Sequence, residues 1–244
     1  MVGGEAAADA VARAHRLPEL RVGLHLNLID GHPILPEVEI PQLVRGKGEF
    51  ERNMVRAGVR FFVFPSVRRQ LASEIRAQFA AFRATGLPLD HVNAHKHMHL
   101  HPSVAKLIID IGRDYGMKAV RVPSEPVAVL RQAFPGELYR APAYHPWSAV
   151  LRRRLRRAGL RTNDHIFGLA WSGGMVEERV LRLIPHLPYG VSEIYFHPAA
   201  QRAQSGDSSI SSYRRTEELA TLLSPLVRSR IAESGIRLDS YSDL

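Results

Sequence analysis

The chain contains no cysteine. Disulfide bonds and thiolate metal ligands are therefore excluded, and a bound metal ion must take its ligands from histidine, aspartate, glutamate or water. A protein without cysteine also fits a reducing compartment, where disulfide bonds are rare.

Long apolar segments are lacking as well. No apolar stretch is long enough to cross a bilayer as a helix. Residues 1–17 (MVGGEAAADAVARAHRL) have neither the basic start nor the apolar segment of a signal peptide. The sequence therefore predicts a cytoplasmic protein.

Arginine, in contrast, is abundant. The 244 residues carry a formal net charge of +9, and one basic cluster consists of Arg152, Arg153, Arg154, Arg156 and Arg157. Such a cluster can face water, an anionic lipid surface or nucleic acid. Because no aromatic residues are interleaved with it, nucleic acid is the least favoured partner. We interpret the cluster as a solvated face, with peripheral contact to the inner membrane as the second interpretation.

Histidines recur at odd positions of residues 89–102, which read LDHVNAHKHMHLHP. A strand alternates its side chains between two faces, so a strand through this run would point all these imidazoles the same way. The intervening positions are mostly apolar and would face the core. Because imidazole is a common ligand of divalent metal ions, the run predicts a metal site. Its histidines are His91, His95, His97, His99 and His101.

A structural role for these histidines is the alternative. A single histidine is often a hydrogen-bonded core residue, and a His-rich tract can be merely compositional. Three to five histidines on one face are hard to bury as structural groups, however, because each ring has two nitrogens to satisfy. The pattern therefore favours metal binding or catalysis.

Helical and extended patterns alternate along the chain. Helices are predicted over residues 5–16, 65–85, 103–115, 152–158, 175–184 and 217–234, and strands over 20–28, the histidine run, 117–122, 191–196 and 236–238. This alternation predicts a single α/β domain with mainly parallel strands. Active residues of such folds gather where strands end, and His25, His95 and His197 lie at or near three predicted strand ends.

Three motifs stand out in the sequence, namely GLHLNL (23–28), DHVNAHKHMHLHP (90–102) and YFHPA (195–199). They resemble motifs of the YdjC family of carbohydrate deacetylases, and within it of the hopanoid-biosynthesis-associated branch called HpnK. The resemblance implies one deacetylase domain over residues 1–244, folded as a distorted (β/α) TIM-like barrel of the glycoside hydrolase/deacetylase type. The implied reaction removes the N-acetyl group of an amino sugar, here an N-acetylglucosaminyl hopanoid lipid.

The resemblance also implies site residues. Family members hold a divalent metal ion with one aspartate and two histidines, which here would be His25 and His95. Zinc, manganese, nickel and magnesium all stay open as the ion. His197 is the candidate acid that protonates the departing amine, and His97 is an alternative acid or orienting residue. Asn27 and Arg121 are the candidate substrate-binding residues.

One part of the family pattern has no counterpart in this sequence. Family members begin with a strand that carries an Asp-Asp motif, which supplies the third metal ligand and the catalytic base. We therefore expect an N-terminally truncated barrel that lacks its first strand, through a misassigned start or a true truncation. Its open seam could be covered in a homodimer. The remaining carboxylates near motifs, Asp30, Asp90 and Asp164, do not match the family position.

Three functions follow in order of preference. The first is a metal-dependent deacetylase. The second is a non-catalytic protein of the same fold that binds glycolipid or metal without turnover. The third is nucleic-acid binding driven by charge, which predicts steep salt dependence and no metal requirement.

Overall fold

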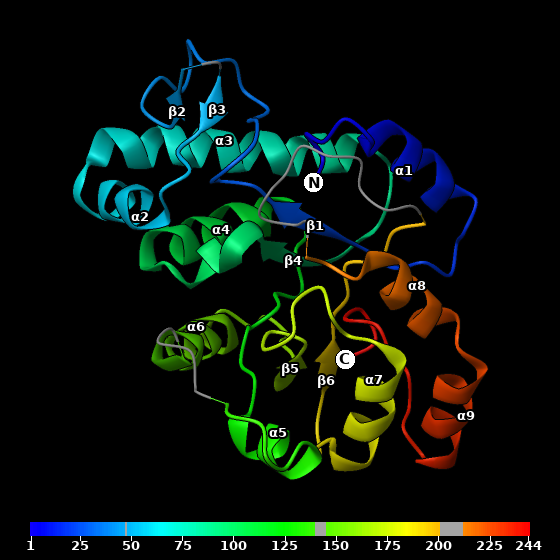
Figure 1. Ribbon diagram of the computed structural model, residues 1–244. Coiled ribbons are helices and arrows are strands. Elements are labelled where there is room, and N and C mark those ends of the chain that lie inside the picture. Colours follow the sequence, from blue (N-terminus) through cyan, green and yellow to red (C-terminus); the bar gives the residue numbers. More distant parts are fainter. Residues whose placement is uncertain (47, 140–144, 201–211) are drawn as a thin grey trace. The chain divides into compact units, whose positions relative to one another are not determined.

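The computed structural model describes residues 1–46, 48–139, 145–200 and 212–244, and it divides into two compact units. The first unit contains Met1–Arg121, Pro146–Thr162 and Ser240–Leu244, and the second contains Val122–His145 and Asn163–Asp239. Figure 1 labels the elements of both units.

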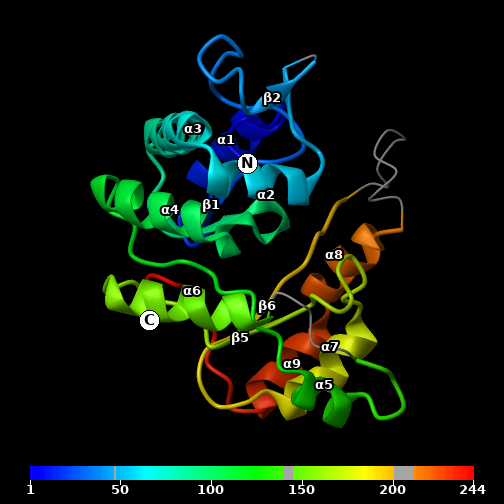
Figure 2. The same ribbon diagram turned by 90° about the vertical axis from the view of Figure 1, so that its left-hand side faces the viewer.

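The first unit holds a pair of parallel strands and most of the longer helices. Its elements are α1 (Ala7–His15), β1 (Val22–Leu26), β2 (Val44–Arg45), β3 (Glu49–Phe50), α2 (Met54–Val63), α3 (Pro65–Ala84), β4 (Leu89–Ala94), the 3-10 segment η1 (His95–Leu100), α4 (Pro102–Asp114) and α6 (His145–Arg157). Helices α2, α3 and α4 pack on one another, as Figure 2 shows.

Strands β1 and β4 run parallel, with His25 opposite Asn93 and Leu26 opposite Ala94. Two isolated parallel bridges continue this arrangement, between Val92 and Val120 and between Ala119 and Arg161. Apolar side chains of both strands pack with those of α3 and α4 in the core of this unit. Buried residues of this core include Leu24, Leu26, Leu71, Ile75, Phe79, Val92 and Ile108.

Helix α3 fixes the chain that leaves β1 through two buried polar side chains. The amide of Gln78 accepts a hydrogen bond from the backbone N–H of Asn27 (2.9 Å) and donates one to its carbonyl oxygen (2.6 Å). The carboxylate of Glu74 accepts from the backbone N–H groups of Ile34 (2.9 Å) and Leu35 (3.0 Å), and from Gln78 (2.8 Å). Glu74 has no solvent exposure. Because a buried carboxylate must be fully hydrogen-bonded, these contacts fix the loop after β1 on α3.

The second unit is built around a second parallel pair. Its elements are α5 (Val127–Ala133), β5 (His165–Phe167), α7 (Glu177–Leu183), the 3-10 turn η2 (Ile184–His186), β6 (Ser192–Ile194), α8 (Arg215–Leu223) and α9 (Pro225–Glu233). Strands β5 and β6 pair in parallel, and α7 lies between α5 and α9 (Figure 1). Phe134, Phe167, Met175 and Leu183 are among the buried residues of its core.

These elements confirm a mixed α/β fold with parallel strands and most of the predicted helices. In the described part of the chain, the strands form three two-stranded sheets rather than a closed barrel, so the TIM-like barrel is not confirmed. The helix predicted over 217–234 is two helices, because Pro225 starts a new one behind the Ser224 cap. No strand forms at 236–238. None of the described helices is long and apolar enough to span a bilayer.

The strand predicted through the histidine run is wrong beyond Ala94. There β4 ends and η1 begins, and within η1 both Lys96 (φ 48°) and His97 (φ 56°) adopt left-handed backbone conformations. A left-handed residue ends the alternation of a strand, so the odd-numbered histidines do not share one face.

Replacing Glu74 with glutamine tests the role of α3. Glu74→Gln exchanges one acceptor oxygen for an amide donor that would face a backbone N–H group. We expect the free energy of unfolding to fall by about 1–3 kcal/mol, because one buried donor loses its partner. Urea unfolding measures this change. Glu37→Gln, in the exposed part of the same loop, is the control, and an equal effect of both variants would contradict the prediction.

Candidate active site

The parallel register of β1 and β4 brings His25 and Asn93 together. The Nδ1–H of His25 donates to Oδ1 of Asn93 across the two strands in a short hydrogen bond. A carbonyl oxygen only accepts, so the ring proton of a neutral His25 is on Nδ1 and the lone pair is on Nε2. Histidine ligands of metal ions are commonly held by such a bond through the other ring nitrogen.

Burial shapes the electrostatics of His25. It lowers the pKa of the imidazole to about 4, against the opposing effect of the Asn93 hydrogen bond. The positive charges of the N-terminus, His95 and Arg121 lower this pKa further. His25 is therefore uncharged at neutral pH, which is the protonation state that a metal ligand requires.

Asn93 continues into a row of hydrogen-bonded polar groups. Its Nδ2 lies 3.5 Å from Nε2 of His91, and Nδ1 of His91 donates to Oδ2 of Asp90 (2.8 Å). The other oxygen of Asp90 accepts from the backbone N–H (3.0 Å) and the hydroxyl (2.9 Å) of Ser242. The ring of Tyr241 covers His91 at 4.5 Å between centroids. This polar row, from His25 to Ser242, ties the C-terminal segment of the first unit to β4.

Glycine is required opposite this row. A Cβ atom at Gly23 would lie 2.6 Å from Cε1 of His91 and 2.8 Å from its carbonyl oxygen. Both distances are shorter than real contacts, so only glycine lets His91 pack on β1. The GLH sequence thus provides space at its first position and His25 at its third.

His95 lies immediately after β4. Its ring centroid is 5.8 Å from that of His25, with the two rings nearly perpendicular (77°). The neighbouring Lys96 turns away and pairs with Asp30, with Nζ 2.9 Å from Oδ2. The hydrogen bond from Lys96, supported by the charges of His95 and Arg52, lowers the pKa of the Asp30 carboxyl despite partial burial. A negative charge thus lies within electrostatic range of His95.

The later histidines of the run separate into different environments. His97 is half-buried, and its ring lies 6.0 Å from that of His99. His99 has no solvent exposure, and burial lowers its pKa well below the ordinary value, supported by the charges of His97 and Arg121. His99 is therefore a core residue rather than part of an exposed polar face. His101 caps α4 instead, since its Nδ1 accepts from the backbone N–H of Ser103 (3.3 Å).

The other predicted site residues lie in three different places. Asn27 is buried, and its side-chain amide donates to the carbonyl oxygen of Asp30 (2.7 Å). Arg121 is half-buried, and its backbone N–H donates to the carbonyl oxygen of Val92 in β4 (3.0 Å). His197 belongs to the second unit, where it follows β6 and is exposed.

His197 is positioned by a buried carboxylate of its own unit. Its backbone N–H donates to Glu218 (2.5 Å), whose other oxygen accepts from the backbone N–H of Met175 (2.8 Å). The rings of Tyr195 and Tyr213 lie 5.3 Å and 5.0 Å from the His197 ring. The role of His197 as an acid stays a prediction.

The separation of the His25 and His95 rings is close to that of two histidine ligands on one metal ion. For two imidazoles on one zinc ion, bond lengths of about 2.0–2.1 Å and a tetrahedral angle place the ring centroids about 5 Å apart. The observed 5.8 Å between His25 and His95 is close to that separation. Among the described residues, no three His, Asp or Glu side chains gather closely enough to hold a metal ion.

Comparison with known proteins assigns the chain to a family. The family model described as YdjC-like protein matches residues 1–233. The chain belongs to the YdjC-like family. Three relatives, each named carbohydrate deacetylase, match over all of this chain: 30% identity in Vibrio vulnificus (strain CMCP6), 29% in Geobacillus stearothermophilus and 26% in Brevibacillus brevis. The chain covers 83%, 84% and 86% of these relatives, respectively.

A solved structure supports the fold. A crystal structure from Enterococcus faecalis V583, whose name refers to cellobiose-phosphate cleavage, superimposes with a TM-score of 0.70 at 21% sequence identity. The match covers 100% of this chain and 85% of that chain. The family resemblance of the motifs is thus confirmed, whereas the hopanoid branch and the absent N-terminal segment stay predictions.

Sequence reasoning missed Asn93 in this YdjC-like chain. The alternation that identified the histidines also contained it, because Asn93 is two residues from His91 on the same strand. An amide two positions from a histidine on one strand face is a candidate partner for that histidine or for the strand beside it. The register with His25 could not be read from the sequence.

Replacing Asp90 with asparagine tests the polar row. Burial raises the pKa of Asp90, but the hydrogen bonds from His91 and Ser242 together outweigh this effect. The pKa of the Asp90 carboxyl therefore lies below its ordinary value. The charged carboxylate therefore stabilises the fold above the unfolded-state pKa of about 3.9, and this contribution is lost as the pH falls through the folded-state value. We expect Asp90→Asn to lower the free energy of unfolding by about 1.5–3 kcal/mol at neutral pH.

The difference between wild type and Asp90→Asn should begin to narrow only as the pH falls below about 4, where the carboxyl group of the unfolded chain binds protons, and should shrink further as the pH falls through the lower folded-state pKa of Asp90. Urea unfolding of both proteins at two pH values measures it. Asp110→Asn, which removes an exposed carboxylate on α4, is the control. A constant difference at both pH values would show that the charge of Asp90 is not what stabilises the row.

Proposed function

We propose that this YdjC-like protein is a carbohydrate deacetylase that hydrolyses the N-acetyl group of an amino sugar. The observation that carries the proposal is the pair His25 and His95 at adjacent strand ends, with His25 held by Asn93. The names of the relatives, which match over the whole of this chain, support the same chemistry.

A divalent metal ion is part of this proposal. His25 and His95 would hold it, and zinc, manganese, nickel or magnesium are compatible with a histidine and oxygen ligand set to differing degrees. A bound ion of this kind polarises the amide carbonyl and lowers the pKa of a bound water. The fit rests on two neighbouring imidazoles, of which the half-buried His25 is uncharged at neutral pH and has its tautomer fixed.

The chain's own residues would then divide the remaining tasks. Asn93 orients His25, and the half-buried Arg121 lies within electrostatic range of His25, so its positive charge would stabilise the negative charge that develops on an acetamide oxygen bound there. The amine leaves only when it is protonated, so a histidine acid is needed, with His197 and His97 as the two candidates. Asn27 is retained as a candidate for binding the sugar.

As the specific substrate we propose an N-acetylglucosaminyl hopanoid lipid. Its support is the resemblance of residues 23–28, 90–102 and 195–199 to the hopanoid-associated branch of the family. We also propose that residues 1–244 act as one deacetylase domain, since the family model extends across both compact units.

Acetate release tests the reaction. Purified protein is incubated with N-acetylglucosamine oligomers and with an N-acetylglucosaminyl lipid, with and without a chelator. We expect chelator-sensitive release of acetate, which His95→Ala reduces by at least about 100-fold because one metal ligand is lost. His32→Ala, an exposed histidine of the same unit, should leave the rate unchanged. Metal binding without acetate release from either substrate would instead indicate a non-catalytic binding protein.

Removing the side-chain amide of Asn93 tests how His25 is oriented. In Asn93→Ala, the His25 ring loses the acceptor that fixes its tautomer and rotation. We expect the affinity for zinc, measured by calorimetry, to fall about 10–100-fold, the range seen when the hydrogen-bond partner of a metal ligand is removed. Asn53→Ala, which removes the cap of α2, is the matched asparagine control. Unchanged affinity in Asn93→Ala would contradict a metal site at His25.

A further inference from the structure

Helix α2 carries apolar side chains on two opposite sides. Ala57 and Phe61 point into the core of the first unit. Val55, Val59 and Phe62 follow the spacing i, i+4 and i+7 on the other side, and they are 73%, 55% and 63% exposed. A helix that is apolar on both sides is usually either buried in a protein interior or in contact with an apolar partner on its outer side.

The exposed apolar surface continues beyond these three residues. Met54 precedes them, and Val63 and Phe64 follow at the junction with α3, each about half exposed. Contiguous exposure of this kind is uncommon in a monomer and marks a contact site. We call Val55, Val59, Phe62, Val63 and Phe64 the α2 stripe.

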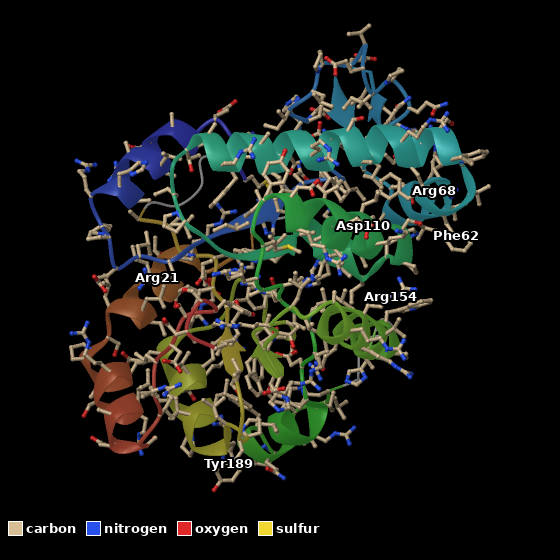
Figure 3. The ribbon with its side chains drawn as sticks, turned by 180° about the vertical axis from the view of Figure 1, so that it is seen from behind. Arg21, Phe62, Arg68, Asp110, Arg154 and Tyr189 are labelled. Atoms are coloured by element: carbon tan, nitrogen blue, oxygen red, sulfur yellow. The ribbon has the colours of Figure 1, made fainter. Side chains whose placement is uncertain are left out.

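Arginines border the α2 stripe on two sides. The guanidinium of Arg68 donates to the carbonyl oxygen of Phe62. On the other side, the Phe62 ring lies 6.3 Å from the His101 ring, and Arg154 of α6 donates to the carbonyl oxygen of the next residue, Pro102 (3.2 Å). Figure 3 shows Arg68, Phe62 and Arg154 along the same edge.

Helix α6 extends this positive charge. An open hollow on its surface is lined by Ala149 and four arginines, namely Arg152, Arg153, Arg156 and Arg157. Trp147 on the same helix is half exposed, and the helical spacing places it on the side of Arg154 rather than on that of the four hollow arginines. An aromatic residue near an arginine is typical of segments at a lipid headgroup layer. Arg56 of α2 forms an ion pair with the buried Glu51, so it contributes less positive charge to the surface around the stripe.

Charge decides which partner fits the α2 stripe. In a two-fold dimer, the same surface would face itself, so Arg68 and Arg154 of each copy would approach arginines of the other. Like charges brought together at a dry interface are unfavourable. An anionic bilayer accepts apolar side chains into its acyl boundary and offers phosphates to the surrounding arginines, so both features are satisfied by one partner.

We propose that the α2 stripe, together with the arginines of α6, docks the protein on an anionic lipid bilayer. The stripe enters the headgroup and acyl boundary, and Arg68, Arg154 and the α6 cluster bind lipid phosphates. This surface does not depend on the deacetylase activity, and its test does not measure turnover.

Flotation with lipid vesicles tests the docking surface. The full chain is mixed with vesicles of phosphatidylcholine alone, or with about 30 mol% phosphatidylglycerol added. We expect binding to the anionic vesicles only, and a loss of at least about tenfold in the partition coefficient when salt is raised from about 0.1 to 0.5 M. Phe62→Ser and Arg154→Glu should each weaken binding about fivefold or more.

Matched controls come from the opposite edge of the same unit. Leu20 is 54% exposed and Arg21 is its neighbour, and Figure 3 shows Arg21 far from Phe62. Leu20→Ser and Arg21→Glu should leave vesicle binding unchanged. Phe62→Trp provides a positive readout, because its fluorescence should shift to shorter wavelength when anionic vesicles are added.

Several results would overturn the proposal. One is failure to bind anionic vesicles at low salt, and another is equal weakening by Phe62→Ser and Leu20→Ser. A concentration-dependent dimer in sedimentation velocity that Phe62→Ser abolishes would assign the α2 stripe to a second copy of the chain. Salt-sensitive binding of duplex DNA that displaces the vesicles and is lost in Arg154→Glu would assign the arginines to nucleic acid.

Discussion

The hydrogen bond between His25 and Asn93 is the constraint on which the polar interior of the first unit depends. It joins two residues that lie opposite each other in the parallel register of β1 and β4, so it forms only when those strands pair correctly. A buried amide left without this partner would cost about 1–3 kcal/mol. Strand register, the orientation of His25 and the satisfaction of Asn93 are therefore one property of the structure.

Distant parts of the chain keep that hydrogen bond in place. Gln78 on α3 fixes the backbone of Asn27 just beyond β1, and Ser242 near the C-terminus binds the Asp90 carboxylate on β4. Each contact satisfies a buried polar group that would otherwise be costly. The histidine pair therefore rests on residues that are far apart in sequence, and stability and site geometry are coupled in this unit.

Strand β4 was predictable because its period of two holds until Ala94, and α3 was predictable from its single apolar stripe. The turn at Lys96 and His97 was not, since left-handed backbone in residues other than glycine leaves no pattern in the sequence. His99 consequently entered the core. Helix α2 was missed because its apolar residues face both inward and outward, which hides the usual helical stripe.

The segment η1 connects the two functional surfaces inferred for the first unit. It begins at His95, beside His25, and is followed directly by His101, whose ring contacts Phe61 and Phe62 of α2. Its conformation is fixed at one end by the Lys96–Asp30 pair and at the other by the His101 cap of α4. Because this short segment is fixed at both ends, its two ends have little freedom to move relative to each other. A bilayer bound at α2 would thus hold the histidine pair at a defined height above the lipid, which suits an acetylated sugar carried on a membrane lipid better than a freely diffusing one.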